Sequence, residues 1–561
     1  MADQRFLVTA ALPYSNGRLH VGHIAGAYLP ADTYVRYLRA CGRDVRFICG
    51  SDDNGVATLI TAMKENSTPQ QITAYYNARQ QADFAGLGIK FDIYGGTHQP
   101  QFVELHERIS QAMFKTIHAK GFFSKRPTKQ LYDPLAGKFL PDRYVEGTCP
   151  YCHYQQAYGD QCEHCGKSMD PLLLIEPLST ITGTRPEVRQ TVHWYLRLDR
   201  FEKPLARWLD GHGNWRPGVL NFCRGLLKEG LPERAMTRDL DWGVPVPLDD
   251  PDARGKVLYV WFDAPIGYIS FTAAYCQRQE GDWQAYERWW KQPDCKIIHF
   301  IGEDNIIFHA LIWPAMLMAE GSYQLPDNVV ANAFLNIKFP GQDEEKISKS
   351  RGTAIWIEEY LKRFEPDPLR YYLTAIAPEA QRSTFDIDEF ISRNNNELLN
   401  TFGNFVNRVL TFACRYLQAR VPQAGNRDEV DRQQLAACRR AADKTAAFLE
   451  RFHFKAALAE VMALARQSNA YFDAKQPWAQ RKTDPAGCAT TINVCIQTIK
   501  TLATIAAPFV PFSAEKCLAQ LGLEAKALPW DQATVELPAG HSLGQPQVLF
   551  RKLDPTELFE A

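Results

Sequence analysis

The sequence predicts an α/β protein whose core is a Rossmann-type, doubly wound parallel sheet. Two apolar runs that read as strands, residues 6–10 and 45–50, each end in a polar turn that contains glycine. Helical patterns follow both turns, at residues 24–38 and 58–64, and this strand–turn–helix repetition is typical of parallel sheets. Such sheets bind ligands beyond the carboxyl ends of their strands, and phosphate in particular at the N-terminus of the following helix.

The middle of the chain predicts an insertion into this sheet. Residues 121–147 are rich in turns and aromatic side chains, and a cluster of cysteines follows them instead of another strand–helix unit. Helical patterns resume near Glu187 and run to about Lys228. Strand-like runs return at residues 257–262 and 296–301. We therefore expect one sheet that the insertion divides into two halves.

The last third of the chain predicts an all-helical domain. Amphipathic spacing dominates after about residue 390, at residues 404–413, 456–465 and 492–507. The expected regions are 1–115 and 231–325 for the two halves of the sheet domain, 116–230 for the insertion, 326–390 for a linking domain, and 391–561 for the helical domain.

Composition and charge exclude several classes of protein. The 63 basic residues nearly balance the 64 acidic ones, so net charge gives no argument for nucleic acid, and DNA is not expected as a partner. Fourteen cysteines in 561 residues are too few for a disulfide scaffold, which indicates a reducing compartment. The N-terminus lacks the pattern of a signal peptide, and no uncharged apolar run reaches about 18 residues. We expect a soluble, cytoplasmic protein without a membrane span.

Four cysteines are spaced as metal ligands. Cys149 and Cys152 form one Cys-x2-Cys pair, and Cys162 and Cys165 form a second pair after nine intervening residues. Two such pairs can surround one Zn²⁺ with four thiolates. Because four protein ligands leave no position for substrate, this zinc is expected to be structural. The alternative ligands are the neighbouring His153 and His164.

Two further motifs are candidates for nucleotide chemistry. His20 and His23 lie three residues apart at the start of a predicted helix and share one face, and Gly22 between them lets a ligand approach the backbone. Residues 346–352, Lys-Ile-Ser-Lys-Ser-Arg-Gly, form a basic loop of small residues that can hold a polyphosphate. Each motif alone also fits an ordinary interpretation, as capping histidines or as a solvated basic turn.

Together the two motifs identify a resemblance. His20-Val-Gly-His23 and Lys346-Ile-Ser-Lys349-Ser resemble the two signatures of class I aminoacyl-tRNA synthetases. The finer match is to the methionyl-tRNA synthetase family, and the zinc knuckle lies where that family carries its connective insertion. The further motifs that resemble this family, in the same order, are residues 11–14, 16–17, 50–52, 260–268, 302–304 and His309.

The resemblance implies an ATP-dependent ligase. Methionine would attack the α-phosphate of Mg-ATP, and methionyl-adenylate would then pass its carboxyl to the 3′-terminal adenosine of methionine tRNA, initiator and elongator alike. Positioning and charge stabilisation would supply the rate, without a nucleophilic residue. The implied catalytic residues are His20, His23, Lys346 and Lys349. The implied ATP-binding residues are Tyr14, Asn16, Gly22, Asp304 and Lys349.

The resemblance also implies a methionine pocket with apolar and aromatic walls, which suit a thioether. Asp52 would pair with the substrate ammonium group, while Tyr14 and His309 would bring a hydroxyl and an imidazole close to the sulfur. Taken alone, Trp261 and Tyr268 are equally typical of a protein core. The implied pocket residues are Ala11, Leu12, Tyr14, Asp52, Val260, Trp261, Ala264, Pro265, Tyr268 and His309.

By the same resemblance, the helical domain would bind the anticodon. Asn404 and Arg408 are four residues apart on a predicted helix and share a face, and Trp478 follows further along the chain. An exposed tryptophan can stack on an unstacked base while asparagine and arginine bind base edges. The alternative for Trp478 is a core position in a helical bundle.

Four positions depart from the family pattern. Asp53 and Asn54 follow Asp52 where many members have glutamate and histidine, although Asp52 itself is retained. Glu303 stands where many members have lysine, and a carboxylate beside a triphosphate is unfavourable unless Mg²⁺ or an arginine screens it. Asn305 stands where some members have an aliphatic residue.

Two alternative functions are left open. A class I ligase for another apolar amino acid usually carries a large editing insertion, which this length does not allow. A paralogue that binds tRNA or an adenylate without charging would be expected to lack His20, His23, Asp52 or Lys349, all of which are present. The chain ends near Phe559 without the RNA-binding extension that some relatives use to dimerise, so a monomer is expected.

Overall fold

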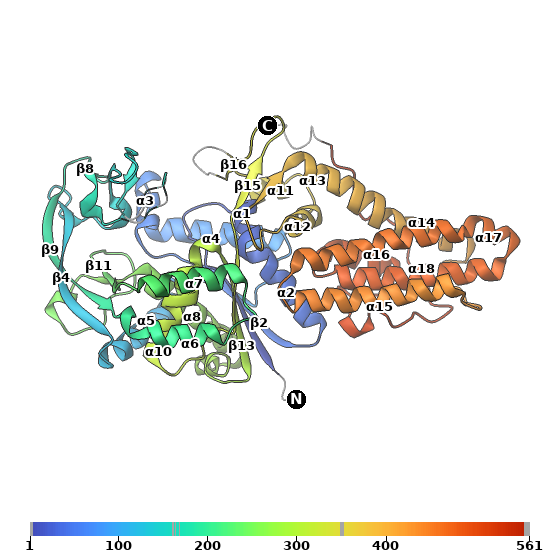
Figure 1. Cartoon of the computed structure of the whole chain (residues 1–561), viewed down its shortest axis with the longest axis horizontal. Helices are drawn as coiled ribbons and strands as arrows, with labels where there is room; N and C mark the ends of the chain where they lie inside the picture. Colours follow the sequence, from blue (N-terminus) through green and yellow to red (C-terminus); the bar gives the residue numbers. More distant parts are fainter. Residues whose placement is uncertain are drawn as a thin grey trace.

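The molecule is elongated, with an α/β part toward one end of its long axis and a bundle of helices toward the other (Figure 1). Strand β8 (Ile175–Ser179) and its neighbouring strands of the predicted insertion lie at the outer end of the α/β part, and α17 (Pro477–Thr483) lies at the opposite end of the molecule. The computed structural model describes residues 4–159, 162, 164–165, 167, 169–347 and 353–554.

The core of the α/β part is a five-stranded sheet in the order β14-β13-β1-β2-β3, in which all neighbouring strands are parallel. The strands predicted at residues 6–10, 45–50 and 296–301 are confirmed. Central strands of a parallel sheet are buried on both faces, which explains their continuous apolar runs. The bounds are β1 Arg5–Ala10, β2 Asp44–Ser51, β3 Ile93–Gly96, β13 Cys295–Gly302 and β14 Asn328–Asn332.

Helices follow the carboxyl ends of these strands. After β1 the chain enters α1 (Val21–His23), a π-helical segment (Ile24–Tyr28) and α2 (Leu29–Ala40), which confirms the predicted helix. Helix α8 (Val260–Glu280) packs against β2 and β3, and most of its residues are buried. The other helices of this part are α3 Val56–Lys64, α4 Pro69–Gly86, α5 Val103–Ala119, α9 Glu287–Trp290 and α10 Trp313–Glu320.

The strand predicted over residues 257–262 is wrong beyond Leu258. Only β12 (Val257–Leu258) is extended, and α8 begins at Val260, with Pro265 inside the helix. A short apolar run has the same signature in a buried strand and in a buried helix. Because α8 is buried on most of its faces, it shows no polar stripe that would reveal the helical period.

The insertion is built on two long antiparallel strands, β4 (Phe123–Asp133) and β9 (Glu187–Leu196), in register from Phe123 opposite Leu196 to Tyr132 opposite Glu187. The helix predicted to resume at Glu187 is therefore wrong for residues 187–196, where cross-strand pairing overrides the local pattern. Helices return at α6 Glu202–Asp210 and α7 Pro217–Glu229. The shorter strands are β5 Lys138–Phe139, β6 Val145–Thr148, β7 Ala157–Tyr158, β8 Ile175–Ser179, β10 Arg234–Ala235 and β11 Thr237–Arg238.

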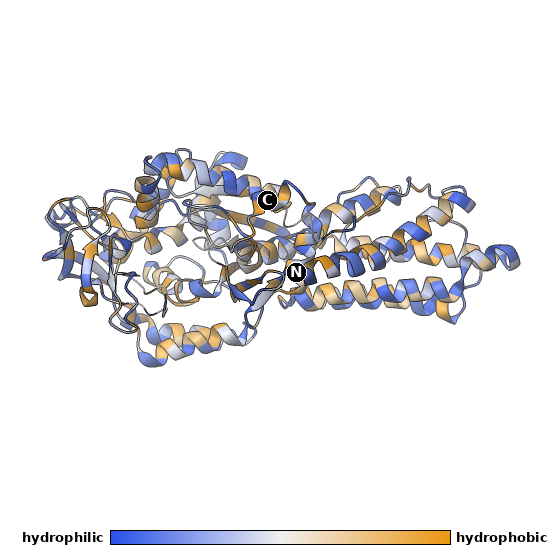
Figure 2. Ribbon diagram, turned by 90° about the horizontal axis from the view of Figure 1, so that it is seen from above, coloured by the Kyte–Doolittle hydropathy of each residue, from blue (hydrophilic) through white to orange (hydrophobic). Residues whose placement is uncertain are grey.

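A small mixed unit links the sheet to the helical part, and the predicted helical domain is confirmed. The unit consists of β15 Leu335–Lys338, β16 Glu345–Lys346, β17 Ser383–Asp386, α11 Ile357–Leu361 and α12 Pro366–Ala375. The following helices are α13 Ile387–Arg393, a π-helical segment Asn394–Gly403, α14 Asn404–Tyr416, α15 Glu429–Leu449, α16 Phe454–Lys475, α17, α18 Pro485–Ala506 and α19 Pro511–Gln520. Hydrophobic and hydrophilic residues alternate along them (Figure 2). Within the described ranges, no helix combines the length and the apolar character needed to cross a bilayer.

A buried arginine ties the α/β part to the helical part. Arg370 of α12 donates from Nη2 to Asp32 Oδ2 of α2 at 2.7 Å and to the Pro508 carbonyl at 3.0 Å. Its Nε donates to the Phe509 carbonyl at 3.0 Å, and Nη1 donates to the Leu87 carbonyl at 3.1 Å. Because both charged side chains are buried, removing Asp32 would leave the Arg370 charge without a carboxylate partner, which fixes this junction.

Candidate active site, metal centre and RNA-binding surface

A cavity of about 400 Å³ opens beyond the carboxyl ends of β1, β2 and β13, where open α/β sheets bind ligands. Its walls come from the turns after these three strands, from the start of α8, and from Ile347 next to β16. Segments that are distant in the sequence therefore meet at one edge of the sheet. Most of the predicted site residues line this cavity: Ala11, Leu12, Tyr14, Asn16, His20, Gly22, His23, Asp52, Trp261, Ala264, Pro265, Tyr268, Asp304 and His309.

Three predicted site residues are not placed around the cavity. Val260 faces Gly55, where an added Cβ would lie 3.1 Å from the Val260 Cβ. Lys346 pairs with Asn336 at the end of β16, one residue before the cavity-lining Ile347. Lys349 lies outside the described residues. The assignment of these three residues to the site stays a prediction.

His20 and His23 form a stacked pair at the start of α1, with ring centroids 3.7 Å apart. His20 is the N-cap: its Nδ1 accepts from the Gly22 N–H at 3.1 Å, and His23 Nδ1 accepts from the His20 N–H at 3.1 Å. A Cβ at Gly22 would meet the His20 ring at 3.0 Å, so glycine permits this cap. Because Nδ1 accepts in both rings, each neutral ring carries its proton on Nε2 and can donate there. The two histidines therefore cap the N-terminus of α1 and also form part of the cavity wall.

Asp52 is a buried carboxylate at the cavity with an unpaired oxygen. The residue is 3% exposed, and within the described part of the chain its Oδ1 has no hydrogen-bond partner. Burial raises the pKa of Asp52 well above its usual range, and the neighbouring Asp263 and Asp53 carboxylates raise it further. An unpaired carboxylate is costly to bury, and a substrate ammonium group would compensate this cost.

The two residues that depart from the family pattern in this turn have structural roles. Asp53 accepts hydrogen bonds from Ser51 Oγ at 2.5 Å and from the His98 backbone N–H at 2.9 Å. Asn54 donates from Nδ2 to Asp263 Oδ2 at 2.7 Å, and its Oδ1 lies 3.0 Å from His98 Nδ1. Both residues are buried, so they hold the turn in place behind the cavity.

Tyr268 and His309 form another wall of the cavity. The Tyr268 hydroxyl lies 2.9 Å from His309 Nε2, and His309 Nδ1 lies 3.2 Å from the Asn305 carbonyl. A carbonyl oxygen can only accept, so Nδ1 carries the proton and Nε2 accepts from the tyrosine. Burial lowers the pKa of His309 to about 4, so the ring is neutral near pH 7. This wall carries no formal charge.

Sequence reasoning missed several residues that line the cavity, and two of them shape its walls. Phe308 stacks on Trp261 with ring centroids 4.0 Å apart, and Tyr14 meets Trp261 edge-on at 6.4 Å. Gln80 of α4 is 1% exposed and donates from Nε2 to the Tyr14 carbonyl at 2.9 Å. Phe308 adjoins a predicted site residue, which is a signal that could have found it. No sequence signal places α4 beside the first turn.

The turn after β13 carries two carboxylates. One of them lines the cavity, and an arginine screens the other. Asp304 is exposed and lines the cavity. Glu303 Oε1 lies 3.2 Å from Arg382 Nε and accepts from the Phe334 N–H at 3.3 Å. An arginine therefore screens the carboxylate that is unfavourable beside a triphosphate.

The four predicted zinc ligands come together in the insertion, with all four sulfur atoms within 4.8 Å of one another. Cys149 Sγ lies 3.9 Å from Cys165 Sγ, and Cys152 Sγ lies 3.6 Å from Cys162 Sγ. A tetrahedron with zinc–sulfur bonds of about 2.3 Å has edges of roughly 3.8 Å, so this donor set fits a tetrahedral zinc ion. The neighbouring histidines are not part of the group.

The predicted RNA-reading residues lie together on the surface of the helical part. The Arg408 guanidinium lies 4.6 Å from the ring centroid of Phe472 and 5.8 Å from that of Trp478. Arg408 also pairs with Asp473 at 2.7 Å. Trp478 is 44% exposed, which argues against a core position, and Asn404 is exposed on the same helix as Arg408.

Comparison with known proteins points to one family. The family model for class I tRNA synthetases (M) matches residues 6–410, and the model for the anticodon binding domain of methionyl tRNA ligase matches residues 421–560. Methionine–tRNA ligase from Porphyromonas gingivalis is 47% identical over 559 residues, which cover 98% of this chain and 79% of that protein. The Parabacteroides distasonis enzyme of the same name is 46% identical over 556 residues, with the same coverage.

A solved structure agrees with these sequence matches. Methionyl-tRNA synthetase from Mycobacterium tuberculosis, bound by methionyl-adenylate, superposes with a TM-score of 0.80 and 25% sequence identity. The match covers 98% of this chain and 100% of that one, so it includes the sheet, the insertion and the helical part. By its sequence, its fold and the cavity at the carboxyl edge of its sheet, the chain belongs to the methionyl-tRNA synthetase family of class I tRNA synthetases.

Proposed function

We propose that the chain is a methionine–tRNA ligase. In the first step the methionine carboxylate bonds to the α-phosphorus of ATP and pyrophosphate leaves. In the second step the 3′-terminal ribose hydroxyl of tRNA attacks the acyl carbon and AMP leaves. The observation that carries the proposal is one cavity that contains both the unpaired Asp52 carboxylate and the His20–His23 pair. An amino acid and a nucleotide can therefore be held side by side.

The chemistry of the walls supports methionine as the amino acid. Asp52 would bind the substrate ammonium group, because its Oδ1 has no partner in the described structure. The thioether would lie against Trp261 and close to the uncharged wall of Tyr268 and His309. A polarizable, neutral sulfur is favoured beside aromatic rings and has no charge for such a wall to balance.

ATP would occupy the part of the cavity beside α1. His20 and His23 would contact the phosphates and ribose at a helix N-terminus, where the helix dipole favours anions. Asp304 would bind the ribose hydroxyls, and Lys346 and Lys349 would follow the departing pyrophosphate. Mg²⁺ bound to ATP would neutralise phosphate charge. Catalysis would rest on positioning and on charge stabilisation, without a covalent enzyme intermediate.

The insertion and the helical part would serve the tRNA. A zinc ion on the four cysteines would hold the knuckle together and take no part in the reaction, because its coordination would be complete. Asn404, Arg408 and Trp478 would read the anticodon. The exposed indole can stack on a base, and the guanidinium beside it can bind a base edge.

The division into five regions and the monomeric, cytoplasmic state are further proposals. Strand β10 pairs with β9, which supports placing the end of the insertion after Ala235 instead of after residue 230. A single chain of 63.7 kDa carries both the proposed catalytic cavity and the proposed anticodon surface. Sedimentation equilibrium at twice this mass would contradict the monomer.

Pyrophosphate exchange into ATP, measured with each of the twenty amino acids, tests the proposed function. Exchange should depend on methionine, and charging of purified methionine tRNA should follow. Exchange with a different amino acid would favour a class I ligase of other specificity. Tight tRNA binding without any exchange would favour the non-charging paralogue.

A further inference from the structure

A second cavity, of about 630 Å³, lies where the α/β part meets the helical part. Gly42 and Lys90 line it, and they precede β2 and β3, so it opens at the amino ends of these strands. Its other side is formed by Ala507, Pro508, Pro511 and residues 526–531. The eight residues of β2 span roughly 25 Å from this edge to the carboxyl edge. A ligand here is therefore separate from the active site.

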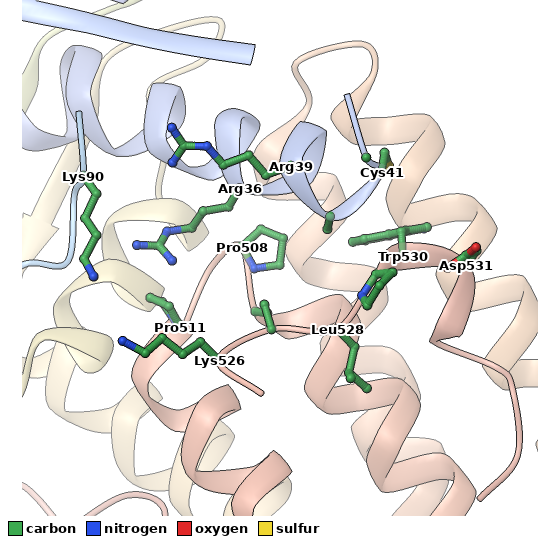
Figure 3. Close-up of a pocket in the computed structure, with 15 residues that line it drawn as sticks. Arg36, Arg39, Cys41, Lys90, Pro508, Pro511, Lys526, Leu528, Trp530 and Asp531 are labelled. Atoms are coloured by element: carbon green, nitrogen blue, oxygen red, sulfur yellow. The ribbon is translucent and has the colours of Figure 1, made fainter. Parts of the chain in front are cut away.

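Positive charge gathers on one side of this junction cavity. Figure 3 shows the charged ends of Arg36, Lys90 and Lys526 reaching toward the same region. Lys90 and Lys526 are exposed, and in the part of the chain that the structure describes neither has a carboxylate partner. The single carboxylate among the lining residues belongs to Asp531. The lining therefore has excess positive charge, which favours an anion.

The arginine in this group is already fixed in position. Arg36 Nε lies 2.7 Å from Asp32 Oδ2, and Arg36 Nη2 donates to the Gly88 carbonyl. Asp32 is shared, because its Oδ2 also lies 2.7 Å from Arg370 Nη2. One carboxylate thus serves two guanidinium groups and does not cancel their charge. A guanidinium held in this way loses little conformational freedom when it binds a phosphate.

The opposite wall of the junction cavity is apolar and contains an aromatic ring. Leu528 and three prolines contribute aliphatic surface, and Trp530 stands beside them (Figure 3). The Trp530 ring packs edge-on against Tyr37, with centroids 5.0 Å apart and planes at 89°, so the indole is held in place. A fixed ring in the same cavity as a group of cations suits a ligand with one planar part and one anionic part.

We propose that the junction cavity binds a nucleoside diphosphate or triphosphate. Its phosphates bind Arg36, Lys90 and Lys526, and its base packs against Trp530. The tRNA backbone is the less suitable occupant, because the 3′ end of tRNA has to reach the carboxyl edge of the sheet and this cavity opens at the amino edge. A bound nucleotide bridges α2 and residues 526–531, and so it joins the two parts of the molecule.

Isothermal titration of the full chain with ADP, GDP and inorganic pyrophosphate tests this assignment. A non-hydrolysable analogue of methionyl-adenylate fills the catalytic cavity first, and its binding is measured separately. If the analogue does not bind, the proposed function fails, and this result is distinct from the result for the junction cavity. The nucleoside diphosphates should still bind with one-to-one stoichiometry. They should bind more tightly than pyrophosphate, which has no base to place against Trp530.

Substitutions connect the binding to the named residues. Lys90→Glu combined with Lys526→Glu should weaken nucleotide binding at least roughly tenfold, because two charge-assisted contacts become repulsive. Both lysines are exposed, so the variant is expected to fold. Lys115→Glu on the exposed face of α5 is the matched control and should leave binding unchanged. Trp530→Leu should remove the preference for nucleotides over pyrophosphate.

Three results would overturn the proposal. One is the absence of nucleotide binding up to roughly 1 mM, the weak end of specific affinities. Another is binding that the double lysine variant leaves unchanged, which would place the nucleotide elsewhere. The third is a double variant that loses tRNA affinity in a protein that binds no free nucleotide, which would make the junction cavity part of an RNA surface.

Discussion

The ring of His299 lies nearly parallel to the ring of Tyr268, with centroids 5.3 Å apart and 28° between the planes. His299 belongs to β13, and its Nδ1 lies 2.6 Å from Thr9 Oγ1 on the neighbouring strand β1. Burial lowers the pKa of His299 well below its usual range, so the stacked ring is neutral. The central sheet, through this stack, therefore sets the position of the tyrosine hydroxyl in the catalytic cavity.

Tyr268→Phe should weaken methionine binding without affecting ATP. The substitution removes the hydroxyl near the proposed thioether position and leaves His309 Nε2 without its donor. We expect the KM for methionine to rise roughly tenfold and the KM for ATP to stay within twofold in pyrophosphate exchange, on the scale of about 1–3 kcal/mol for a lost buried hydrogen bond. Tyr286→Phe, which loses a 3.1 Å bond to Tyr323 outside the cavity, is the control. Equal rises in both KM values would contradict the prediction.

Asp52→Asn should lower methionine affinity selectively. It removes the charge that the substrate ammonium group would meet, at a cost of about 1.5–3 kcal/mol, or roughly 10–150-fold in Kd. Asp53→Asn is the matched comparison, because that carboxylate holds Ser51 and His98 instead of facing the cavity. Asp53→Asn should lower the Tm, and it should reduce methionine affinity less than Asp52→Asn does. Unchanged methionine binding in Asp52→Asn would remove this residue from the site.

The stabilisation of the protein by methionine should increase with pH. Burial, followed by Asp263 and Asp53, raises the pKa of Asp52 in the unliganded protein above its unfolded value of about 3.9. Between these two pKa values the native state binds a proton that the unfolded state lacks, so ionisation makes the unliganded protein less stable as pH rises. An ammonium group favours the ionised form, so the Tm shift caused by saturating methionine should grow across this window. A shift that is independent of pH in the parent chain would refute the linkage.

The stability difference between the parent chain and His309→Gln should shrink in acid. Burial lowers the pKa of His309 from about 6.5 in the unfolded chain to about 4. Between these values the unfolded chain takes up a proton that the native ring does not, so native stability decreases as the pH decreases, by up to about 3 kcal/mol. Glutamine does not titrate and lacks this loss. Urea unfolding at pH 7 and pH 4.5 measures both proteins, and a difference that stays constant would show that His309 does not titrate as described.

Removing zinc should loosen the insertion and leave the catalytic cavity intact. The buried residues around the four cysteines form a hydrophobic cluster separate from the main core. Cys149→Ser should abolish one bound zinc per chain and expose residues 145–179 to limited proteolysis, with methionine binding retained. Cys223→Ser, at a buried cysteine of α7, should keep the zinc and serve as the control. Loss of methionine binding on removal of zinc would show that the knuckle supports the sheet.

The sequence allowed much of the fold to be predicted, for physical reasons. Strands β1 and β2 are buried on both faces and appear as continuous apolar runs, and the turns after them carry the polar groups of the cavity. The zinc ligands follow from a spacing that few other structures need. The bundle helices α14 and α16 show the period expected of a helix packed on a core, whereas α18 is buried at every residue from Thr490 to Ala506, so the amphipathic pattern predicted there is wrong.

Other features depend on packing between distant segments, which no local pattern reports. Helix α8 is buried on most of its faces, and β9 is a strand because β4 lies beside it. Gln80, Phe308 and the stack of His299 on Tyr268 depend on which helix or strand is the neighbour in space. The family resemblance placed many site residues but gave no account of the junction cavity, whose lining residues share no sequence motif.

Strands β4 and β9 leave the α/β part as a pair, with Phe123 directly opposite Leu196. The chain therefore departs and returns at points about 5 Å apart, the spacing of paired residues in antiparallel strands. Over generations the segment between these points can grow, shrink or change its metal ligands without moving a residue of β1, β2 or β13. The segment between Phe123 and Leu196 can therefore vary freely in evolution. In the central sheet, by contrast, the relative placement of every strand has to be kept.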